Sequence, residues 1–457
     1  MSTFKSAIVT VTLIFGSFCA AQSTELRLRR PEKVGMSTEK LADLSRAMQE
    51  YVDNQTVAGV SVLVARKGHV VYRENFGVSD LESGRPMQDD TIFRIASMTK
   101  FVVSVAAFTL IEDGVLCRHT PLSDFVPEFA SPSVIQQTEG SVATDFTVAA
   151  SSREILIENL LDHTSGLEYR FHNHPVLGQL YADNGIWDGF NTVPQGGATT
   201  LGEMVAERLA ELPLLFEPGE QFTYSLSHDV LGHVIEVATG MSLADYLNQR
   251  LFIPLEMDST FFFTNNPDQI NRMATVYTPD GNGIRALGND PVELFPNFYA
   301  DNGFPFMGPQ EIYSGGAGLS ATLNDFYRLV QMVENGGQIR PKCGWGRVRV
   351  LNRRSVHNLL SVRDHDPRMD PFTEQFGWKG YRFNNGAGVH VDPSESGKAA
   401  SIGQISWNGA FNTMFFMDPE QELIGIMMAQ LVPFLGNDMQ AQFERLTYEA
   451  LIDPNER

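Results

Sequence analysis

Apolar residues near the start of the chain recur at spacings that predict a helix followed by a β-hairpin. Ser37 can cap a helix whose apolar positions recur at helical spacing, at Leu41, Leu44, Met48 and Tyr51. Residues 59–66 (GVSVLVAR) and 69–73 (HVVYR) are strand-like runs on either side of the turn Lys67-Gly68. This opening predicts antiparallel strand pairing, which argues against a doubly wound parallel sheet.

The rest of the chain divides into a helical middle and a strand-rich end. Helix-like patterns separated by long polar loops cover residues 155–161, 201–212 and 229–251. Strand-like runs follow at residues 403–407, 413–417 and 423–430, before a last helix-like pattern over 439–452. We therefore predict an α/β (α+β) fold whose antiparallel sheet, flanked by helices, is built from residues 26–100 and 310–457. A mainly helical domain with long loops, residues 101–309, is inserted into it.

The first 21 residues have the pattern of a signal peptide. A short cationic stretch, residues 1–5, precedes an apolar stretch, residues 7–18, that is too short to span a bilayer comfortably. Small residues, Cys19-Ala20-Ala21, then allow cleavage before Gln22. We expect a secreted or periplasmic protein, with a membrane anchor or a buried helix as the alternatives. No later stretch is long and apolar enough to cross a membrane, so stable membrane insertion is not expected.

Charge and cysteine content exclude several classes of protein. The chain has 55 acidic and 34 basic residues, a net charge of −21, and such a surface repels the phosphates of nucleic acids. Three cysteines are too few for a disulfide scaffold or a thiolate zinc cluster. Cys117 and Cys343 could form one bridge or remain two buried thiols. His172 and His174 lack a third ligand, so no metal is expected.

A buried helix that begins with a lysine is the strongest chemical signal. Residues 98–111 are apolar on almost every side, which predicts burial, yet Lys100 lies in the first turn. Burial lowers the pKa of a lysine and makes it a usable base, and Ser97 lies one turn away at the positive end of the helix dipole. A nucleophile with an adjacent base needs this combination. The alternative is that Ser97 caps the helix and Lys100 reaches solvent.

The same spacing elsewhere in the chain lacks this environment. Ser37 and Lys40 also form a Ser-x-x-Lys pair, but they lie on a polar, capped helix. The spacing alone is therefore a weak signal, and the predicted burial of the helix is what singles out Ser97 and Lys100.

Two further segments contain candidate catalytic groups. Tyr224 follows the Pro218-Gly219 turn, and a phenol beside an ammonium ionises more easily and can relay a proton. At the end of a predicted strand, Trp407 is followed by Gly409 and Ala410; a glycine permits close backbone approach, and the next N–H can face an oxyanion. Taken alone, the tyrosine is better explained as a packed aromatic and the strand end as a bulge.

In this order, the three segments resemble the serine β-lactamase and penicillin-binding-protein superfamily, and most of all the family VIII carboxylesterases, relatives of class C β-lactamases. The likeness covers roughly residues 40–433 and includes residues 160–167 (LLDHTSGL) and 314–320 (SGGAGLS). It implies a β-lactamase/transpeptidase-like fold without a metal or an organic cofactor.

The resemblance also implies a role for each matching residue. Ser97 would be the acylated nucleophile, and Lys100 and Tyr224 the pair that transfers its proton. The backbone N–H groups of Ser97 and Ala410 would form the oxyanion hole. Trp407 and Gly409 would shape the strand beside the scissile carbonyl.

Departures from the family pattern indicate the substrate. Trp407-Asn408-Gly409 stands where β-lactamases and transpeptidases have Lys-Thr-Gly, and Leu226 stands where they have the asparagine of Tyr-x-Asn. Losing a cationic and an amide contact weakens binding of β-lactams and peptides by about a few kcal/mol. An indole and a leucine suit an apolar acyl group. Asn408 also departs from the Trp-Gly-Gly usual in such esterases, which affects the local backbone.

The expected function is hydrolysis of short- to medium-chain carboxylic esters through an acyl-enzyme on Ser97. A small-molecule ester is the expected partner, and the oligomeric state is left open. The alternatives are an acyltransferase, a D-amino-acid peptidase or a weak β-lactamase on the same fold, or a catalytically silent binding protein. Aromatic clusters at residues 261–263 and 295–306 are expected in the core, and part of the second could line an acyl pocket.

Overall fold

The computed structural model describes eight stretches of the chain: residues 28–136, 146–193, 196–281, 283–307, 310–342, 345–363, 378–433 and 436–452. The predicted signal peptide, residues 1–21, lies outside these stretches, and so does Cys343.

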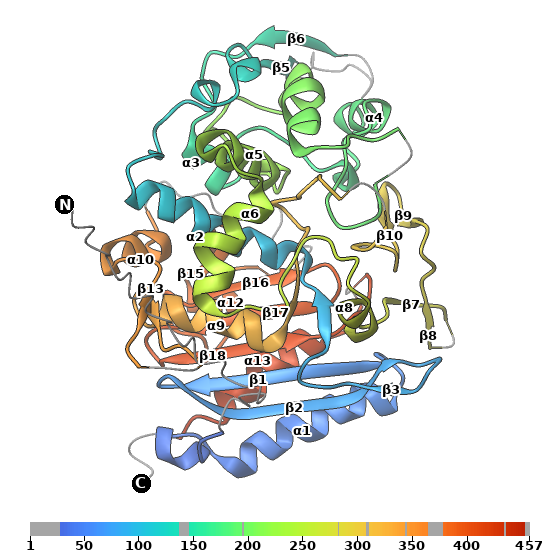
Figure 1. Ribbon diagram of the computed structural model, residues 1–457, viewed down its shortest axis with the longest axis vertical. Helices are drawn as coiled ribbons and strands as arrows, with labels where there is room; N and C mark the ends of the chain where they lie inside the picture. The colour runs from blue at the N-terminus through green and yellow to red at the C-terminus, as the bar shows by residue number, and fades with distance from the viewer. Residues whose placement is uncertain are drawn as a thin grey trace, which may run out of the picture.

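An eight-stranded antiparallel sheet lies in the lower half of the molecule (Figure 1). Its antiparallel pairing was predicted, whereas its strands at residues 85–86, 381–384 and 387–390 were not. Its spatial order is β14-β15-β16-β17-β18-β1-β2-β3. The N-terminal strands are β1 (Gly59–Arg66), β2 (His69–Asp80) and β3 (Arg85–Pro86). The C-terminal strands are β14 (Tyr381–Asn384), β15 (Ala387–His390), β16 (Ile405–Gly409), β17 (Thr413–Asp418) and β18 (Leu423–Met428). The two ends of the chain meet where β18 pairs with β1, with Ser61 opposite Met428.

Helices cover both faces of this sheet. Helices α1 (Thr38–Asp53) and α13 (Met439–Glu449) lie on one face, and α2 (Thr99–Glu112) and α9 (Leu323–Glu334) lie on the other (Figure 1). Alternate residues of β1 point to opposite faces, so this strand is buried on both sides. Val60, Val62 and Val64 pack toward α1 and α13, whereas Leu63 and Ala65 join the core around α2.

The predicted N-terminal elements are confirmed. Helix α1 begins after Ser37, whose side chain accepts a hydrogen bond from the N–H of Lys40, and it buries Leu41, Leu44 and Met48. The hairpin of β1 and β2 follows, with a second strand longer than the pattern indicated.

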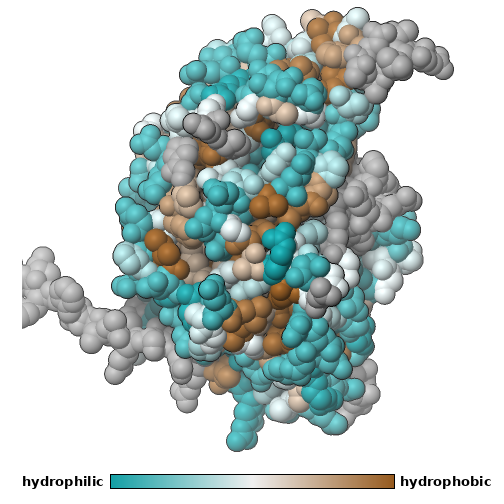
Figure 2. All heavy atoms as spheres, turned by 90° about the vertical axis from the view of Figure 1, so that its right-hand side faces the viewer, coloured by the Kyte–Doolittle hydropathy of each residue, from teal (hydrophilic) through white to brown (hydrophobic). Residues whose placement is uncertain are grey.

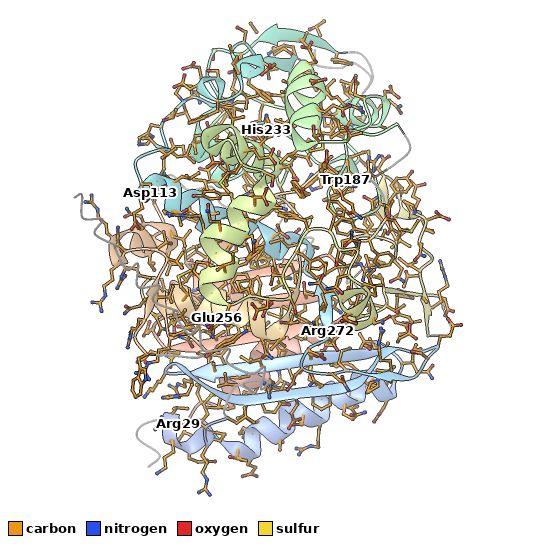
Figure 3. The ribbon with its side chains drawn as sticks, in the orientation of Figure 1. Arg29, Asp113, Trp187, His233, Glu256 and Arg272 are labelled. Carbon is orange, nitrogen blue, oxygen red and sulfur yellow. The ribbon has the colours of Figure 1, made fainter. Side chains whose placement is uncertain are left out.

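The segment between α2 and α9 is mainly helical; its first helices lie above α2 in Figure 1, whereas its last helix and the hairpin that follows it lie lower, at the right near β3. Its helices are α3 (Ile157–Leu161), α4 (Leu177–Asp183), α5 (Ser227–Thr239), α6 (Leu243–Leu247), α7 (Ile253–Leu255) and α8 (Pro267–Arg272). Its hairpins are β5 (Ser133–Gln136) with β6 (Thr147–Ala150), β7 (Tyr277–Pro279) with β8 (Ile284–Ala286), and β9 (Val292–Phe295) with β10 (Phe298–Ala300). Trp187, labelled in Figure 3, is buried in this part, where its N–H donates to the carbonyl of Asn191.

Two helical predictions need correction. The pattern over residues 229–251 is not one helix, because α5 ends at Gly240 in the left-handed region (φ 67°) and α6 restarts after Ser242, which caps Asp245. The pattern over residues 201–212 forms a π-helical turn, Glu203–Arg208, followed by a 3-10 turn, Leu209–Glu211. In the first case, the apolar periodicity continues, but Gly240 ends one helix and Ser242 caps the start of the next.

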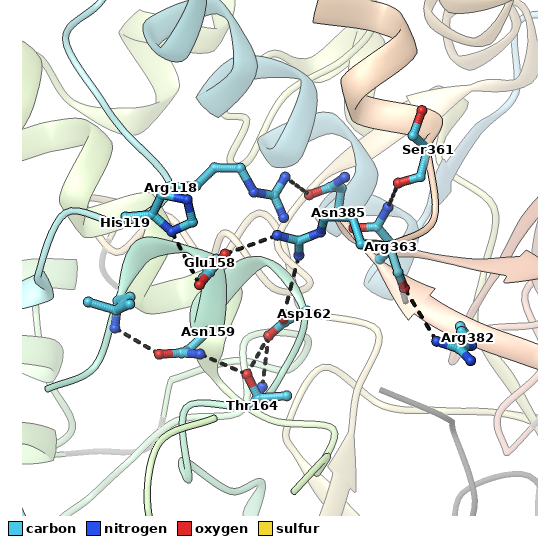
Figure 4. Close-up of polar contacts among 12 residues, drawn as sticks. Arg118, His119, Glu158, Asn159, Asp162, Thr164, Ser361, Arg363, Arg382 and Asn385 are labelled. Atoms are coloured by element: carbon cyan, nitrogen blue, oxygen red, sulfur yellow. Dashed lines mark hydrogen bonds and ion pairs between the residues drawn. The ribbon is translucent and has the colours of Figure 1, made fainter. Parts of the chain in front are cut away.

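Ion pairs tie the helical part to the remainder of the molecule. The guanidinium of Arg363, which follows α10 (Arg353–Leu360), lies 2.9 Å from the Glu158 carboxylate of α3 and 3.7 Å from that of Asp162 (Figure 4). In a second contact, Glu256, labelled in Figure 3, lies 2.6 Å from the guanidinium of Arg328 of α9. These contacts fix α3 and the segment after α7 against the sheet layer.

The one described cysteine differs from both sequence expectations. Cys117 is a free, exposed thiol, so it neither forms the bridge considered for Cys117 and Cys343 nor is buried. It lies in the loop that leaves the buried helix α2 for the surface. Within the described stretches, each helix is too short or too polar to cross a bilayer.

Candidate active site

Ser97 lies in a tight turn between a strand and the central helix. β4 (Ile92–Arg94), which pairs with β11 (Ser320–Thr322), leads into a 3-10 turn, Ala96–Met98, and then into α2. Ala96 has a φ of 42°, in the left-handed region that non-glycine residues seldom adopt. This conformation holds Ser97 in the turn, two residues before α2 begins.

A buried arginine fixes the strand that leads to this turn. The guanidinium of Arg94 donates to the carbonyls of Ala274 (2.9 Å) and Asn302 (2.6 Å), and to that of Phe304. Its side chain is almost completely buried, so these bonds are not shared with solvent. The turn that carries Ser97 is thus anchored to a segment from the helical part.

Lys100 is completely buried and lies at the centre of the site. Every residue of α2 from Thr99 to Leu110 is buried, which confirms the predicted buried helix and rules out a lysine that reaches solvent. The Nζ atom donates to the hydroxyl of Tyr169 (2.9 Å) and the carbonyl of Gly316 (2.8 Å), and lies 3.5 Å from the Oγ of Ser97. The structure therefore brings the predicted nucleophile and base together.

The charge of Lys100 is balanced by a buried carboxylate, Asp229. Burial lowers the pKa of Lys100 from 10.5 to about 7, while the charge of Asp229 acts in the opposite direction. Burial raises the pKa of Asp229 to about 6, opposed by Lys100 and by hydrogen bonds from the Ser314 hydroxyl and the Gly316 N–H. A lysine with this pKa is partly neutral near pH 7 and can accept a proton.

A glycine makes this close arrangement possible. A Cβ atom on Gly316 would lie 2.4 Å from Oδ2 of Asp229 and 2.8 Å from the hydroxyl of Tyr169. Any larger residue would push apart the groups that surround the Lys100 ammonium. The motif of residues 314–320 therefore supplies backbone contacts to the base.

Tyr224 lies against both Ser97 and Lys100. Its ring centroid is 4.5 Å from the Nζ of Lys100, and its hydroxyl accepts a hydrogen bond from the indole N–H of Trp407 at 3.3 Å. Burial raises the pKa of Tyr224, while hydrogen bonds with Ser97 and Trp407 oppose the rise. The easier ionisation expected beside the ammonium is not favoured, because desolvation outweighs the two hydrogen bonds that lower the pKa of Tyr224. Tyr224 is a neutral phenol that can pass a proton along.

Tyr169 and Asp229 are the residues that the sequence reasoning missed. Tyr169 lies two positions after the stretch at residues 160–167, and its hydroxyl is the nearest side-chain partner of Lys100. Asp229 lies in α5, shortly after Tyr224. The signal that could have found Asp229 is the buried lysine itself, since a buried ammonium needs an opposite charge.

The predicted oxyanion strand packs directly on the turn that carries Ser97. A Cβ atom on Gly409, the last residue of β16, would lie 2.3 Å from the carbonyl oxygen of Ile95, so only glycine fits. Ala410 packs against the apolar cluster that contains Ala96. This proximity is what two N–H donors on one oxyanion require; the donation itself by Ser97 and Ala410 stays a prediction.

The remaining predicted residues have different surroundings. Trp407 packs against Tyr224, with ring centroids 5.4 Å apart. Leu226 is completely buried in the main core, so its contact with a substrate stays a prediction. The amide of Asn408 donates to Gln440 of α13 at 2.6 Å, because neighbouring strand residues point to opposite faces. The departure at Asn408 therefore anchors the strand rather than altering the side that faces Ser97.

The residues described offer no cluster for a metal. No group of three or more His, Cys, Asp or Glu side chains among them could hold one. His172, considered as a ligand, instead pairs with Glu168.

The fold and the site define a class of enzyme. A serine hydroxyl lies beside a buried lysine and a neutral tyrosine, at the start of a helix and against the end of a strand. These groups can carry out acyl transfer through a serine nucleophile. A family model, Beta-lactamase, matches residues 44–448. The chain therefore belongs to the Beta-lactamase family, and it is a serine hydrolase of that superfamily.

Individual relatives agree with this assignment. Protein Rv1367c of Mycobacterium tuberculosis is 30% identical over 426 residues, 89% of this chain and 98% of that protein. Esterase EstB of Burkholderia gladioli is 30% identical over 383 residues, 82% of this chain and 87% of the esterase. Among solved structures, EstCE1, a hydrolase with promiscuous acyltransferase activity, superimposes with a TM-score of 0.73 at 26% identity, covering 91% of this chain and 99% of its own. These matches confirm the predicted fold class and superfamily.

Proposed function

We propose that the protein hydrolyses short- to medium-chain carboxylic esters through an acyl-enzyme on Ser97. The observation that carries the proposal is the completely buried Lys100, whose Nζ lies 3.5 Å from the Ser97 hydroxyl and whose pKa is lowered to about 7. A neutral amine at this position can take the hydroxyl proton as the oxygen attacks the ester carbonyl.

The steps follow from the arrangement of these groups. The Ser97 oxygen bonds to the carbonyl carbon, and its proton passes to Lys100, directly or through Tyr224. The proton then moves to the alkoxy oxygen, the carbon–oxygen bond breaks, and the alcohol leaves. A water molecule attacks the acyl-enzyme, gives its proton to the same pair, and releases the acid and the free serine. Backbone N–H groups of Ser97 and Ala410 would stabilise the oxyanion in both stages.

The strand that faces the site supports an ester rather than a β-lactam. Trp407, buried beside Tyr224, places an indole where β-lactamases carry the lysine that helps bind the substrate carboxylate. A substrate with a free carboxylate would therefore lose one ionic contact, while an ester loses nothing. The similarity to EstB, whose name records an esterase, agrees with this choice.

Acyl transfer to an alcohol is the second candidate. EstCE1 is described as a hydrolase with promiscuous acyltransferase activity, and an alcohol can replace water in the second stage without any new group in the site. D-amino-acid peptidase or weak β-lactamase action and a silent binding role are the remaining alternatives; each fails to use the apolar environment of Trp407 or the paired Ser97 and Lys100.

Substrate preference tests the proposal. We expect kcat/KM for p-nitrophenyl butyrate to exceed that for nitrocefin by at least about 100-fold, which corresponds to the loss of a charged contact of a few kcal/mol. Addition of a primary alcohol to the same assay should yield the transferred ester if the second candidate holds. Turnover of nitrocefin or a D-alanyl-D-alanine peptide above that of the ester would contradict the proposal.

We also propose that the chain is exported. The support is the cationic and apolar pattern of residues 1–21 and the small residues before Gln22. N-terminal sequencing of the protein secreted by an expressing host should begin at Gln22. A protein that stays in the cytoplasm and keeps residues 1–21 would contradict this.

A further inference from the structure

Four phenylalanine rings continue from the site toward the surface, and we name Phe171, Phe190, Phe295 and Phe298 the aromatic wall. Phe171 stacks on Tyr169, the partner of Lys100, with centroids 4.7 Å apart and an interplanar angle of 20°. The ring centroid of Phe298 lies 5.7 Å from that of Phe171 and 5.0 Å from that of Phe190. Phe295 stacks on Phe298, with ring centroids 4.3 Å apart and an interplanar angle of 13°. A row of rings therefore begins beside Tyr169, the hydrogen-bond partner of Lys100, and continues toward the surface.

The wall lies beside the nucleophile as well as the base. Phe190 and Phe298 form a buried apolar cluster with Ala96, the residue before Ser97, and Ala410 packs against the same cluster. Phe171 and Phe295 are only half-buried, so ring surface is left for a ligand. Figure 2 shows the face that carries β9 and β10, where hydrophobic side chains gather in the middle among hydrophilic ones.

Hydrogen bonds hold the wall in place. The tip of the β9–β10 hairpin, Asn297, donates through its amide to Asn173 at 2.8 Å, which fixes the hairpin to the turn that carries Phe171. Nearby charges are paired: Arg170 lies 3.0 Å from Asp188, and its guanidinium stacks over the Tyr299 ring at 5.0 Å. The wall is thus a fixed apolar surface.

We propose that the aromatic wall selects esters that carry a planar aromatic ring near the scissile carbonyl. The inference rests on the proposed ester hydrolysis and names its substrate class. Rings that stack or meet edge to face gain more than their buried area provides, and a saturated ring of the same size lacks this term. The gain for one ring pair corresponds to a preference of about 2- to 10-fold.

The aromatic ring could enter on either side of the ester, and two substrate pairs distinguish the sources. Ethyl 3-phenylpropanoate against ethyl 3-cyclohexylpropanoate tests the acyl side. 3-Phenylpropyl acetate against 3-cyclohexylpropyl acetate tests the alcohol side. We expect kcat/KM to favour the phenyl member by about 2- to 10-fold in one of the pairs.

Variants connect this preference to the wall. In Phe298→Leu and in Phe295→Leu, the phenyl-to-cyclohexyl ratio should fall to about 1, because leucine fills the space without a ring. The half-buried Phe295 offers the gentler change should Phe298→Leu fail to fold. Phe125→Leu is the matched control, since Phe125 is a half-buried phenylalanine outside the wall, and it should keep the wild-type ratio. The ratio is independent of the fraction of folded enzyme.

The outcomes separate this inference from the proposed function. Equal kcat/KM for both members of both pairs would overturn the aromatic preference while leaving ester hydrolysis intact. A preference that survives in Phe295→Leu and Phe298→Leu would show that another surface is responsible, and would also overturn it. Absence of turnover for all four esters in an enzyme that hydrolyses p-nitrophenyl butyrate would also overturn the inference, whereas absence of turnover for p-nitrophenyl butyrate as well would refute the proposed function.

Discussion

Replacing Ser97 with alanine is expected to reduce ester turnover by at least about 1,000-fold, because the substitution removes the oxygen that forms the acyl-enzyme. The fold should be unaffected, since the Ser97 side chain is only a small part of the anchored turn before α2. The measurement is p-nitrophenyl butyrate hydrolysis together with the intact mass after exposure to a fluorophosphonate. Wild type should gain the mass of one phosphonyl group, and Ser97→Ala should gain none.

The chain contains its own matched control for this experiment. Ser37 stands in the same Ser-x-x-Lys spacing, but its side chain caps α1, a helix at the surface. Ser37→Ala should therefore label and turn over like wild type, at the cost of about 1 kcal/mol of stability from the lost cap. Ester turnover that persists in Ser97→Ala, or labelling at another serine, would show that the nucleophile is assigned wrongly.

Replacing Lys100 with methionine is expected to lower kcat by about 100- to 10,000-fold, because it removes the group that accepts the Ser97 proton. Methionine is similar in length and tolerates burial, so the packing of α2 should persist, and the melting temperature checks this. Lys40→Met is the matched control on α1, where the side chain is exposed, and it should leave kcat unchanged. A Lys100→Met enzyme that is folded and retains wild-type kcat would exclude Lys100 as the base.

The pH profile gives a second test of the same residue. Only neutral Lys100 accepts a proton, so kcat/KM should rise with pH, with a midpoint near 7, because burial lowers the lysine pKa to about that value. The negative charge of Asp229 holds this pKa up. Asp229→Asn removes that charge, so the midpoint should move to lower pH. A midpoint that moves upward or does not move would contradict the pairing of Asp229 with Lys100.

Much of the scaffold follows from local sequence. Ser37 and the apolar spacing after it define α1, and alternation along residues 59–66 defines a strand buried on both faces, because both signals act within a few neighbouring residues. Where two local signals competed, the prediction was wrong. The helical periodicity of residues 229–251 indicated one helix, yet Gly240 adopts the left-handed conformation and ends α5.

The pairing of Ser97 with Lys100 was also predictable, since residues three apart at the start of a helix lie on the same side and an all-apolar helix is buried. What surrounds Lys100 was not. Its partners Tyr169, Asp229 and Gly316 come from distant parts of the chain. The spacing of these residues in the sequence does not predict that they lie close together. The protonation state of Tyr224 likewise depends on its burial, and therefore on every element that packs around it. The residues that can react are recognisable from local sequence alone. Their protonation and their neighbours depend on the tertiary structure, because desolvation and charge act through space rather than along the chain.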